Sequence, residues 1–542
     1  MDISELKITK GERVGLLGKS GSGKTTLLRI LRGVEPFDGG RVVIDGIELT
    51  PESDKEKFRE VKKRTAIHLQ RSFGLWSEKT IDNVIRALSY TIWGDEILPE
   101  EGTSFYEELF ERAMNILELV DLKHKAECWA EVLSGGEKQR LVLARQVAKN
   151  PSILLVDEFG TMTCPETRRK SIEVLKKINE NLGITVIFSS HMPDIHEELA
   201  GRVIVLDKGV LVGDGSVEES LERFLSRTEA SIIREDIKKG GENVKSDKVS
   251  KKYYVIPGGR TLELNDVTFS VRKGEIVGLV GRSGSGKTVI SRLIAGLELP
   301  DKGKILIKTG KKWINWSSFG EENVRARRKI GILHQEFALP YWALVRDLIS
   351  YRIRLKREDI VKEAEDKAKK LDINEKLFDV IYRMTDLPKE EAEIRLKRLG
   401  LSYDIVKELF TEGEEDIGVI YPILEELDLP VEILERYTHE LSGGESVRLG
   451  IALAAVTKPD ILILDEPFGD IDPLTLRKVI NFLKKINIEQ QTTMIIVSHQ
   501  HDLIREIADR VFMIRGDHVE EYAPHALTEV SLGNIELHAN SW

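Results

Sequence analysis

Two glycine-rich segments have the residue types and spacing of a phosphate-binding loop. Each follows the pattern Gly-x-x-x-x-Gly-Lys-Thr between an apolar run and a helix-like run, and the two lysines are Lys24 and Lys287. In such a loop, backbone N–H groups and a helix start face phosphate oxygens, the lysine neutralises them and the threonine hydroxyl binds Mg²⁺. We therefore predict two nucleotide sites, formed by Gly18, Ser20, Gly21, Ser22, Gly23, Lys24, Thr25 and Thr26, and by Gly281, Ser283, Gly284, Ser285, Gly286, Lys287, Thr288 and Val289.

An Asp-Glu pair ends an apolar run in each half of the chain. The pairs are Asp157-Glu158 and Asp465-Glu466. Parallel strands bring their carboxyl ends to the edge of the sheet where nucleotides bind. We predict that Asp157 and Asp465 hold Mg²⁺ through water and that Glu158 and Glu466 polarise the attacking water. The alternative, a solvated strand end, is disfavoured because the arrangement recurs.

A third repeated segment, Leu-Ser-Gly-Gly-Glu, opens an apolar helix in each half. Because a helix start favours anions, these segments predict further phosphate contacts, by Ser134, Gly135, Gly136, Ser442, Gly443 and Gly444. The intervals also repeat. The serine precedes the Asp-Glu glutamate by 24 residues in both halves, and that glutamate precedes His191 or His499 by 33.

The order of these elements predicts an α/β fold in two copies. Each half alternates apolar strand-like runs with helix-like runs, which is typical of a mostly parallel sheet covered by helices. Gln70 precedes Ser134 by 64 residues, whereas Gln335 precedes Ser442 by 107, so the second copy carries 43 extra residues. We expect a first domain over 1–225, a charged linker over 226–250, and a second domain over 251–542 with an enlarged helical arm at about 345–440.

Composition narrows the class of protein. The net charge of −10 disfavours a protein whose main work is to bind a nucleic-acid backbone. The two cysteines, Cys128 and Cys164, form no CxxC pair and cannot by themselves hold an iron–sulfur cluster or a zinc ribbon. The sequence contains no run of about 20 apolar residues, the length needed to span a bilayer, and the charged N-terminus is unlike a signal peptide. We expect a cytoplasmic protein with no membrane segment of its own.

In combination, these motifs resemble the ATP-binding-cassette (ABC) family over nearly the whole chain. The resemblance implies an ATP hydrolase with ATP and Mg²⁺ as cofactors. It also implies two tandem P-loop NTPase domains, each with a helical subdomain inserted between a glutamine loop and the Leu-Ser-Gly-Gly-Glu signature. The two halves would pair head to tail, joining Lys24 with Ser442 and Gly444, and Lys287 with Ser134 and Gly136. The implied catalytic residues are Glu158, Glu466, His191, His499, Gln70 and Gln335, and the implied metal-site residues are Thr25, Gln70, Asp157, Thr288, Gln335 and Asp465.

His499 has a neighbouring histidine, which raises the alternative of a metal site. His499-Gln500-His501-Asp502 contains two histidines and a carboxylate, but the first half has no residue equivalent to His501. Because His499 stands where His191 predicts it, we favour the γ-phosphate switch histidine that the resemblance implies.

The chain departs from the ABC pattern in two places. It starts only 23 residues before Lys24, which leaves no room for the strand that carries an adenine-stacking aromatic in this family, whereas the second half keeps Tyr253 and Tyr254, of which Tyr254 is a candidate. Cys164 stands where the second half has the D-loop aspartate Asp472. We expect the two sites to be unequal.

A narrower resemblance concerns the second half. The segments 330–339, 384–388 and 427–434, together with 160–162, look like the ATP-binding component of the methyl-coenzyme M reductase activation system of methanogens. This implies that ATP hydrolysis is coupled to reductive activation of the nickel tetrapyrrole of the reductase. Nickel and iron–sulfur clusters would then belong to partners, namely the reductase and its iron–sulfur-bearing activation proteins.

Other interpretations remain open for what the ATPase drives. It could energise a membrane ABC transporter. A nucleic-acid or ribosome factor would favour a long basic arm or a cysteine-rich domain, and neither is present. The arm from 361 to 435 is predicted to dock a partner, or else it is a larger subdomain without one. Phe337, Tyr341 and Trp342 are a second candidate contact, or part of the subdomain core.

Overall fold

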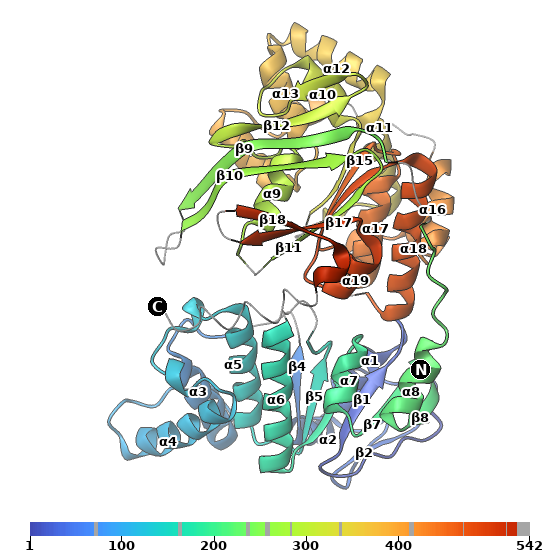
Figure 1. Ribbon diagram of the computed structural model, residues 1–542. Coiled ribbons are helices and arrows are strands. Elements are labelled where there is room, and N and C mark those ends of the chain that lie inside the picture. Colours follow the sequence, from blue (N-terminus) through green and yellow to red (C-terminus); the bar gives the residue numbers. More distant parts are fainter. Residues whose placement is uncertain are drawn as a thin grey trace. The chain divides into compact units, whose positions relative to one another are not determined.

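The computed structural model describes residues 1–69, 74–160, 165–234, 239–254, 261–281, 284–334, 339–410, 417–469, 471–515 and 518–527. The chain forms two compact units (Figure 1), and the second begins at Glu229.

The first unit is built on a six-stranded sheet. Its central strands are almost entirely buried, as expected where helices cover both faces of a parallel sheet. Five strands are parallel and β8 pairs antiparallel with β7. The spatial order is β4 (Thr65–Leu69), β5 (Ile153–Asp157), β6 (Thr185–Ser189), β1 (Arg13–Leu17), β7 (Arg202–Asp207) and β8 (Val210–Gly215).

Helices surround this sheet, and three of them form a subdomain between β4 and β5. That subdomain contains α3 (Thr80–Trp93), α4 (Ser104–Leu119) and α5 (Gly135–Ala148). The other elements are α1 (Lys24–Leu31), β2 (Val42–Ile44), β3 (Ile47–Leu49), α2 (Lys55–Arg64), α6 (Pro165–Leu182), α7 (Pro193–Leu199) and α8 (Val217–Leu225).

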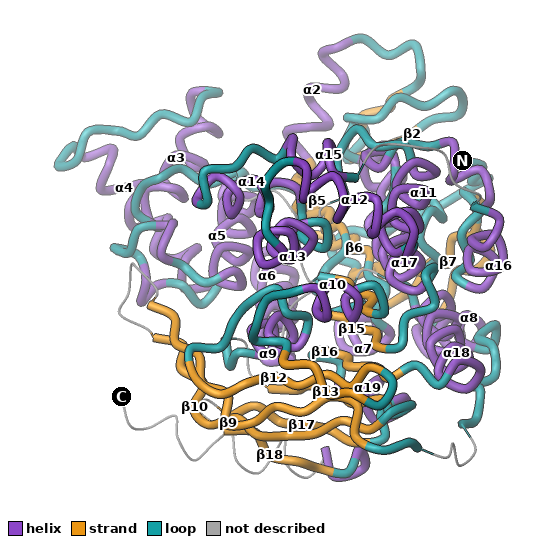
Figure 2. Tube along the Cα trace, turned by 90° about the horizontal axis from the view of Figure 1, so that it is seen from above, coloured by secondary structure: helices purple, strands orange, loops and turns teal. Residues whose placement is uncertain are grey.

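The second unit repeats the sheet and adds an antiparallel one. The repeated order is β14 (Ile330–Leu333), β15 (Ile461–Asp465), β16 (Thr493–Val497), β11 (Ile276–Gly281), β17 (Arg510–Arg515) and β18 (His518–Tyr522). The added sheet has the order β10 (Thr261–Arg272), β9 (Glu242–Tyr254), β12 (Lys302–Thr309) and β13 (Lys312–Asn315), and its strands are labelled in the lower part of Figure 2. The predicted fold class, tandem α/β domains with inserted helices, is confirmed.

The prediction of a charged linker over 226–250 is wrong for residues 242–250, which belong to strand β9. Val244, Ser246 and Val249 are buried, while lysines and an aspartate lie between them. Val244 pairs with Val271, and Val249 with Val267, on β10. The charged residues therefore occupy the outer face and the irregular positions of an antiparallel strand rather than a solvated connection.

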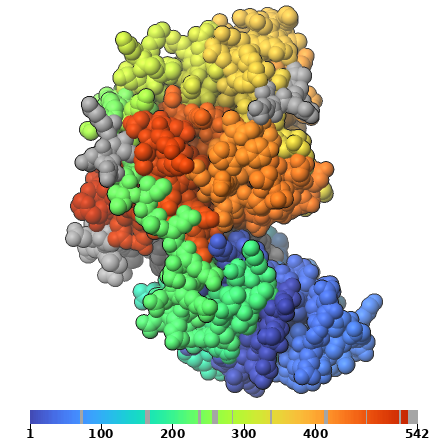
Figure 3. Space-filling view, turned by 90° about the vertical axis from the view of Figure 1, so that its right-hand side faces the viewer, coloured from blue at the N-terminus to red at the C-terminus, as the bar shows by residue number. Residues whose placement is uncertain are grey.

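The arm of the second unit consists of short helices that pack into the core of that unit. The rings of Phe378, Tyr382 and Phe410 contact one another and join the same apolar cluster as Val244 and Ile305 of the antiparallel sheet. In Figure 3 the residues of the arm are coloured from yellow to orange. Its helices are α11 (Val345–Lys356), α12 (Glu358–Lys370), α13 (Glu375–Met384), α14 (Lys389–Arg398), α15 (Asp404–Leu409), α16 (Tyr421–Glu426) and α17 (Gly443–Ala455).

Four further helices complete the second unit. They are α9 (Lys287–Ile294), α10 (Glu321–Arg327), α18 (Pro473–Gln490) and α19 (His501–Ile507). Among the described residues, no helix is both long and apolar enough to cross a membrane.

Candidate active sites

The first glycine-rich loop connects β1 to α1 and folds around its lysine. Gly23 directly precedes α1 with φ 97°, a left-handed conformation that disfavours residues with a Cβ. The Lys24 ammonium donates to the carbonyl oxygens of Gly18 and Lys19, both at 2.8 Å. Burial lowers the pKa of Lys24 to about 8. A phosphate at this loop would favour the charged form of the lysine.

The second loop, between β11 and α9, has the same form. Gly286 has φ 100°, and the Lys287 ammonium donates to the carbonyl oxygen of Gly281 at 3.0 Å. The hydroxyls of Ser22 and Ser285, which are equivalent, are buried and have no hydrogen-bond partner within the described parts of the chain. A phosphate oxygen bound at each loop would give the serine hydroxyl of that loop a hydrogen-bond partner, so both loops fit a nucleotide. Thr26 and Val289 lie in the first turns of α1 and α9.

The Asp-Glu pairs lie at the carboxyl ends of β5 and β15, as predicted. The Asp157 carboxylate accepts hydrogen bonds from Thr25 Oγ1 at 3.0 Å and from Ser189 Oγ at 2.8 Å. Burial raises the pKa of Asp157. The structure therefore brings together Thr25 and Asp157, two of the residues predicted at the first metal site.

The equivalent carboxylates of the second unit, Asp465 and Glu466, are also largely buried. Burial raises the pKa of Asp465 to about 6 and the pKa of Glu466 to about 7. Asp465 Oδ1 is buried without a hydrogen-bond partner among the residues that the structure describes. A divalent cation would stabilise this charge, so the donor set of Asp465 and Thr288 fits Mg²⁺.

Each glutamate lies against the histidine that follows it by 33 residues. His191 Nε2 is 3.1 Å from Glu158 Oε1, and His499 Nε2 is 3.3 Å from Glu466 Oε1. Both glutamates have left-handed backbones, with φ 50° and 52°, which is a strain commonly found at functional sites. The His191 side chain is 3% exposed and that of His499 33%, so the two sites differ in solvent access.

The Leu-Ser-Gly-Gly-Glu segments begin helices in both units. Ser134 and Ser442 are the N-caps of α5 and α17, and each forms a capping box with the glutamate three residues later. The glycines at 135, 136, 443 and 444 therefore occupy the first helical turn, where backbone N–H groups are available to an anion.

Several predicted residues lie outside the described part of the structure. They are Gln70, Gln335, Ser283, Cys164 and Phe337. Tyr254 ends strand β9, but its side chain is outside the described residues, so its predicted stacking stays a prediction. The neighbouring Tyr253 donates its hydroxyl to the Glu298 carboxylate.

Ser189 is a site residue that the sequence analysis missed. Its hydroxyl donates to Asp157 at 2.8 Å and accepts from the backbone N–H of Glu158 at 2.8 Å. The equivalent residue of the second unit is Val497, so this bridge is specific to the first unit. A polar residue at the end of a strand that neighbours the Asp-Glu strand was the available signal.

Tyr341 and Trp342 are surface residues, which excludes their assignment to the subdomain core. They are 63% and 73% exposed, and their rings contact His439 with centroid separations of 4.9 and 4.6 Å. Tyr437 also stacks on this histidine.

The raised pKa of Glu466 predicts how the activity of the second unit depends on pH. A carboxylate accepts a proton from water only when ionised, so turnover in a Glu158→Gln background is expected to fall as the pH decreases through about 7. Initial rates between pH 5.5 and 8.5 measure this. A flat profile over that range, with the protein still folded, would contradict the assignment of Glu466 as the proton acceptor.

Comparison with known proteins gives a consistent picture. The ABC transporter family matches residues 1–160 and 264–469. An uncharacterized ABC transporter ATP-binding protein of Methanocaldococcus jannaschii is 46% identical over 520 residues, which cover 95% of this chain and 90% of that protein. A second such protein of the same organism is 32% identical over 547 residues, covering 94% and 89%.

Solved structures add a likeness of fold. The archaeal ribosome recycling factor aABCE1, solved in complex with a ribosomal stalk protein, superposes with a TM-score of 0.57. It is 18% identical, and the match covers 98% of this chain and 90% of that one.

Proposed function

The chain belongs to the ABC transporter family, and we propose that it couples ATP hydrolysis at two sites to conformational work on a protein partner. ABC ATPases bind ATP with Mg²⁺ and hydrolyse it, which confirms the predicted enzyme class and cofactors. The observation that carries the proposed coupling is the enlarged arm of the second unit, whose helices α12 to α15 pack into the core of that unit.

The proposed chemistry assigns roles to the lysines, threonines, carboxylates and histidines of the two sites. Lys24 and Lys287 bind the phosphates, and the pairs Thr25–Asp157 and Thr288–Asp465 hold Mg²⁺. When bound, Mg²⁺ neutralises charge on the phosphate oxygens. Glu158 and Glu466 orient water and accept its proton, and His191 and His499 position these glutamates, which lie 3.1 and 3.3 Å away.

We propose that the partner is methyl-coenzyme M reductase together with its iron–sulfur-bearing activation proteins. The support is the resemblance in segments 330–339, 384–388 and 427–434, of which the second contains the buried Asp386. ATP binding and release would change the position of the arm and so the contact with the reductase, while electrons come from iron–sulfur clusters on the partners.

The energising subunit of a membrane transporter is a second candidate function. The matching family is the ABC transporter family, and both relatives from Methanocaldococcus jannaschii are described as ABC transporter ATP-binding proteins. The two candidates differ in their partners, because a transporter subunit binds a membrane permease.

Capture of the native partner tests the proposal and distinguishes the two candidates. A tagged Glu466→Gln variant, held in the ATP-bound state under anaerobic conditions, is expected to retain reductase subunits and iron–sulfur proteins. A purified reductase that becomes active only with this protein, ATP and a reductant would establish the function. Retention of a permease instead would favour the transporter.

Surface substitutions on the arm test where the partner docks. Deleting α12 to α15 would remove part of the core, so the docking surface is better changed from outside. Ile394 and Leu399 are 56% and 54% exposed. We expect Ile394→Asp with Leu399→Asp to reduce partner capture at least tenfold with ATP turnover unchanged. Leu182→Asp, at a position 50% exposed in the first unit, is the control. Equal capture by both variants would place the docking surface elsewhere.

A further inference from the structure

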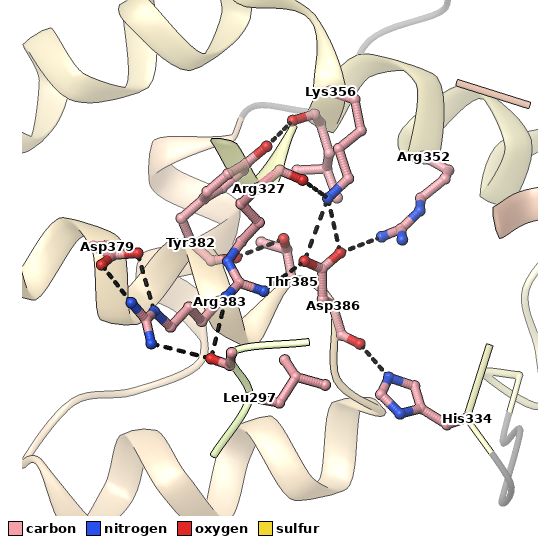
Figure 4. A network of polar contacts seen from close by, with 12 residues as sticks. Leu297, Arg327, His334, Arg352, Lys356, Asp379, Tyr382, Arg383, Thr385 and Asp386 are labelled. Atoms are coloured by element: carbon pink, nitrogen blue, oxygen red, sulfur yellow. Dashed lines mark hydrogen bonds and ion pairs between the residues drawn. The ribbon is translucent and has the colours of Figure 1, made fainter. Parts of the chain in front are cut away.

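A buried cluster of charges lies where the arm meets the rest of the second unit. The Asp386 carboxylate is completely buried and accepts from Arg352 Nη1 at 2.7 Å, Lys356 Nζ at 3.0 Å and Arg327 Nη1 at 3.1 Å (Figure 4). Arg327 comes from α10, and the other two cations come from α11. Three cations from two separate helices therefore depend on one carboxylate for charge neutralisation.

The cluster also contacts the segment that follows the phosphate-binding helix α9. Arg327 Nη2 and Arg383 Nη1 donate to the carbonyl oxygen of Gly296 at 3.1 and 3.0 Å. Arg383 is in turn held by Asp379 on the same helix, α13, at 2.8 Å. Because α9 begins at Lys287 and ends at Ile294, the cluster fixes the end of this helix opposite to the phosphates.

A second contact leads from the cluster to the strand end beside the catalytic carboxylates. His334 Nε2 lies 2.7 Å from the backbone carbonyl oxygen of Asp386 (Figure 4). Burial lowers the pKa of His334, so its imidazole is neutral and Nε2–H is the donor. His334 directly follows β14, whose Leu333 pairs with Leu464, the residue before the Asp465-Glu466 pair.

The first unit has a smaller inserted subdomain, α3 to α5, and its described residues have no histidine at this position. By strand register, the residue equivalent to His334 is Leu69, which is 40% exposed. Leu69 cannot donate a hydrogen bond from its side chain. The connection between arm and strand end is thus particular to the second unit.

We infer that His334 and Asp386 are positioning residues that couple displacement of the arm to the nucleotide site of the second unit. The cluster holds α11, α13, the end of α9 and the end of β14 together, so a shift of the arm moves both the phosphate-binding helix and the strand beside Glu466. This role does not depend on which partner binds the arm, and it therefore stands apart from the proposed function.

Hydrogen exchange without any partner tests the coupling. In a Glu466→Gln background, ATP with Mg²⁺ is expected to slow exchange of peptides from α11 and α13 at least twofold. His334→Leu, which installs the residue of the first unit, should abolish this response while ATP still binds. His334→Gln keeps an N–H donor and should retain the response. Leu69→His, in the first unit, is the matched control and should leave the response of the arm unchanged.

Steady-state kinetics gives a second readout that a purely structural role would not produce. With Glu158→Gln as background, His334→Leu should lower kcat about tenfold with little change in KM for ATP, because misplacement of catalytic groups acts on the chemical step. If His334→Leu fails to fold, Arg352→Met provides a second variant at the partly exposed side of the cluster. An unaltered arm response in a folded His334→Leu protein, or loss of that response in His334→Gln as well, would overturn the inference.

Discussion

Replacing Glu466 with glutamine is expected to lower ATP turnover by the second unit about 100-fold or more and to leave ATP bound. This is the usual scale for losing a positioned general base. Glutamine keeps the shape of the side chain but cannot accept a proton, and it preserves a polar group beside His499, which lies 3.3 Å from the glutamate. Binding of ATP should persist because Lys287 and its loop are unchanged.

Steady-state hydrolysis and nucleotide retention after gel filtration measure the two expectations. Glu158→Gln reports on the first unit, and the double variant should be nearly inactive. Glu489→Gln makes the same chemical change at an exposed position on α18 and is the control. Wild-type turnover in the double variant would refute hydrolysis at these two sites.

Replacing Asp386 with alanine is expected to destabilise the second unit by about 3–5 kcal/mol. Removing one member of a buried ion pair leaves its partners charged and desolvated, which is far more costly than losing an exposed pair. Here the change would leave Arg327, Arg352 and Lys356 without their common carboxylate. Burial lowers the pKa of Lys356 to about 7, so this lysine is the one that can lose its charge in response.

Chemical denaturation followed by fluorescence measures the loss of stability. Asp366→Ala, on the solvent-exposed face of α12, is the control and should change stability by less than about 0.5 kcal/mol. The first unit should unfold at the same denaturant concentration in both proteins. A loss below about 1 kcal/mol in Asp386→Ala would mean that the cations find other partners or water.

The nucleotide sites could be predicted from sequence because their residues are local or lie at repeated intervals. The interval from glutamate to histidine is the same in both halves, and in the structure His191 lies beside Glu158 and His499 beside Glu466. The strand order is also the same in both units. Strand β9 was not predicted, because lysines alternate with its buried residues and make the segment look like a linker. The partners of Asp386 were not predictable either, since Arg327 and Lys356 are brought together only by tertiary packing.

The inserted arm also has a consequence for the chain entropy of the unfolded protein. Strands β14 and β15 are neighbours in the sheet, but the whole arm separates them along the chain, from Leu333 to Ile461. The equivalent strands β4 and β5 are separated only by the shorter segment from Leu69 to Ile153. Closing a loop costs only about 0.6 kcal/mol more for each doubling of its length, and the insertion lengthens this loop by less than one doubling. The sheet could therefore accept the larger arm at almost no cost in loop-closure free energy, so the energy of ordering the added residues must come from the arm's own packing.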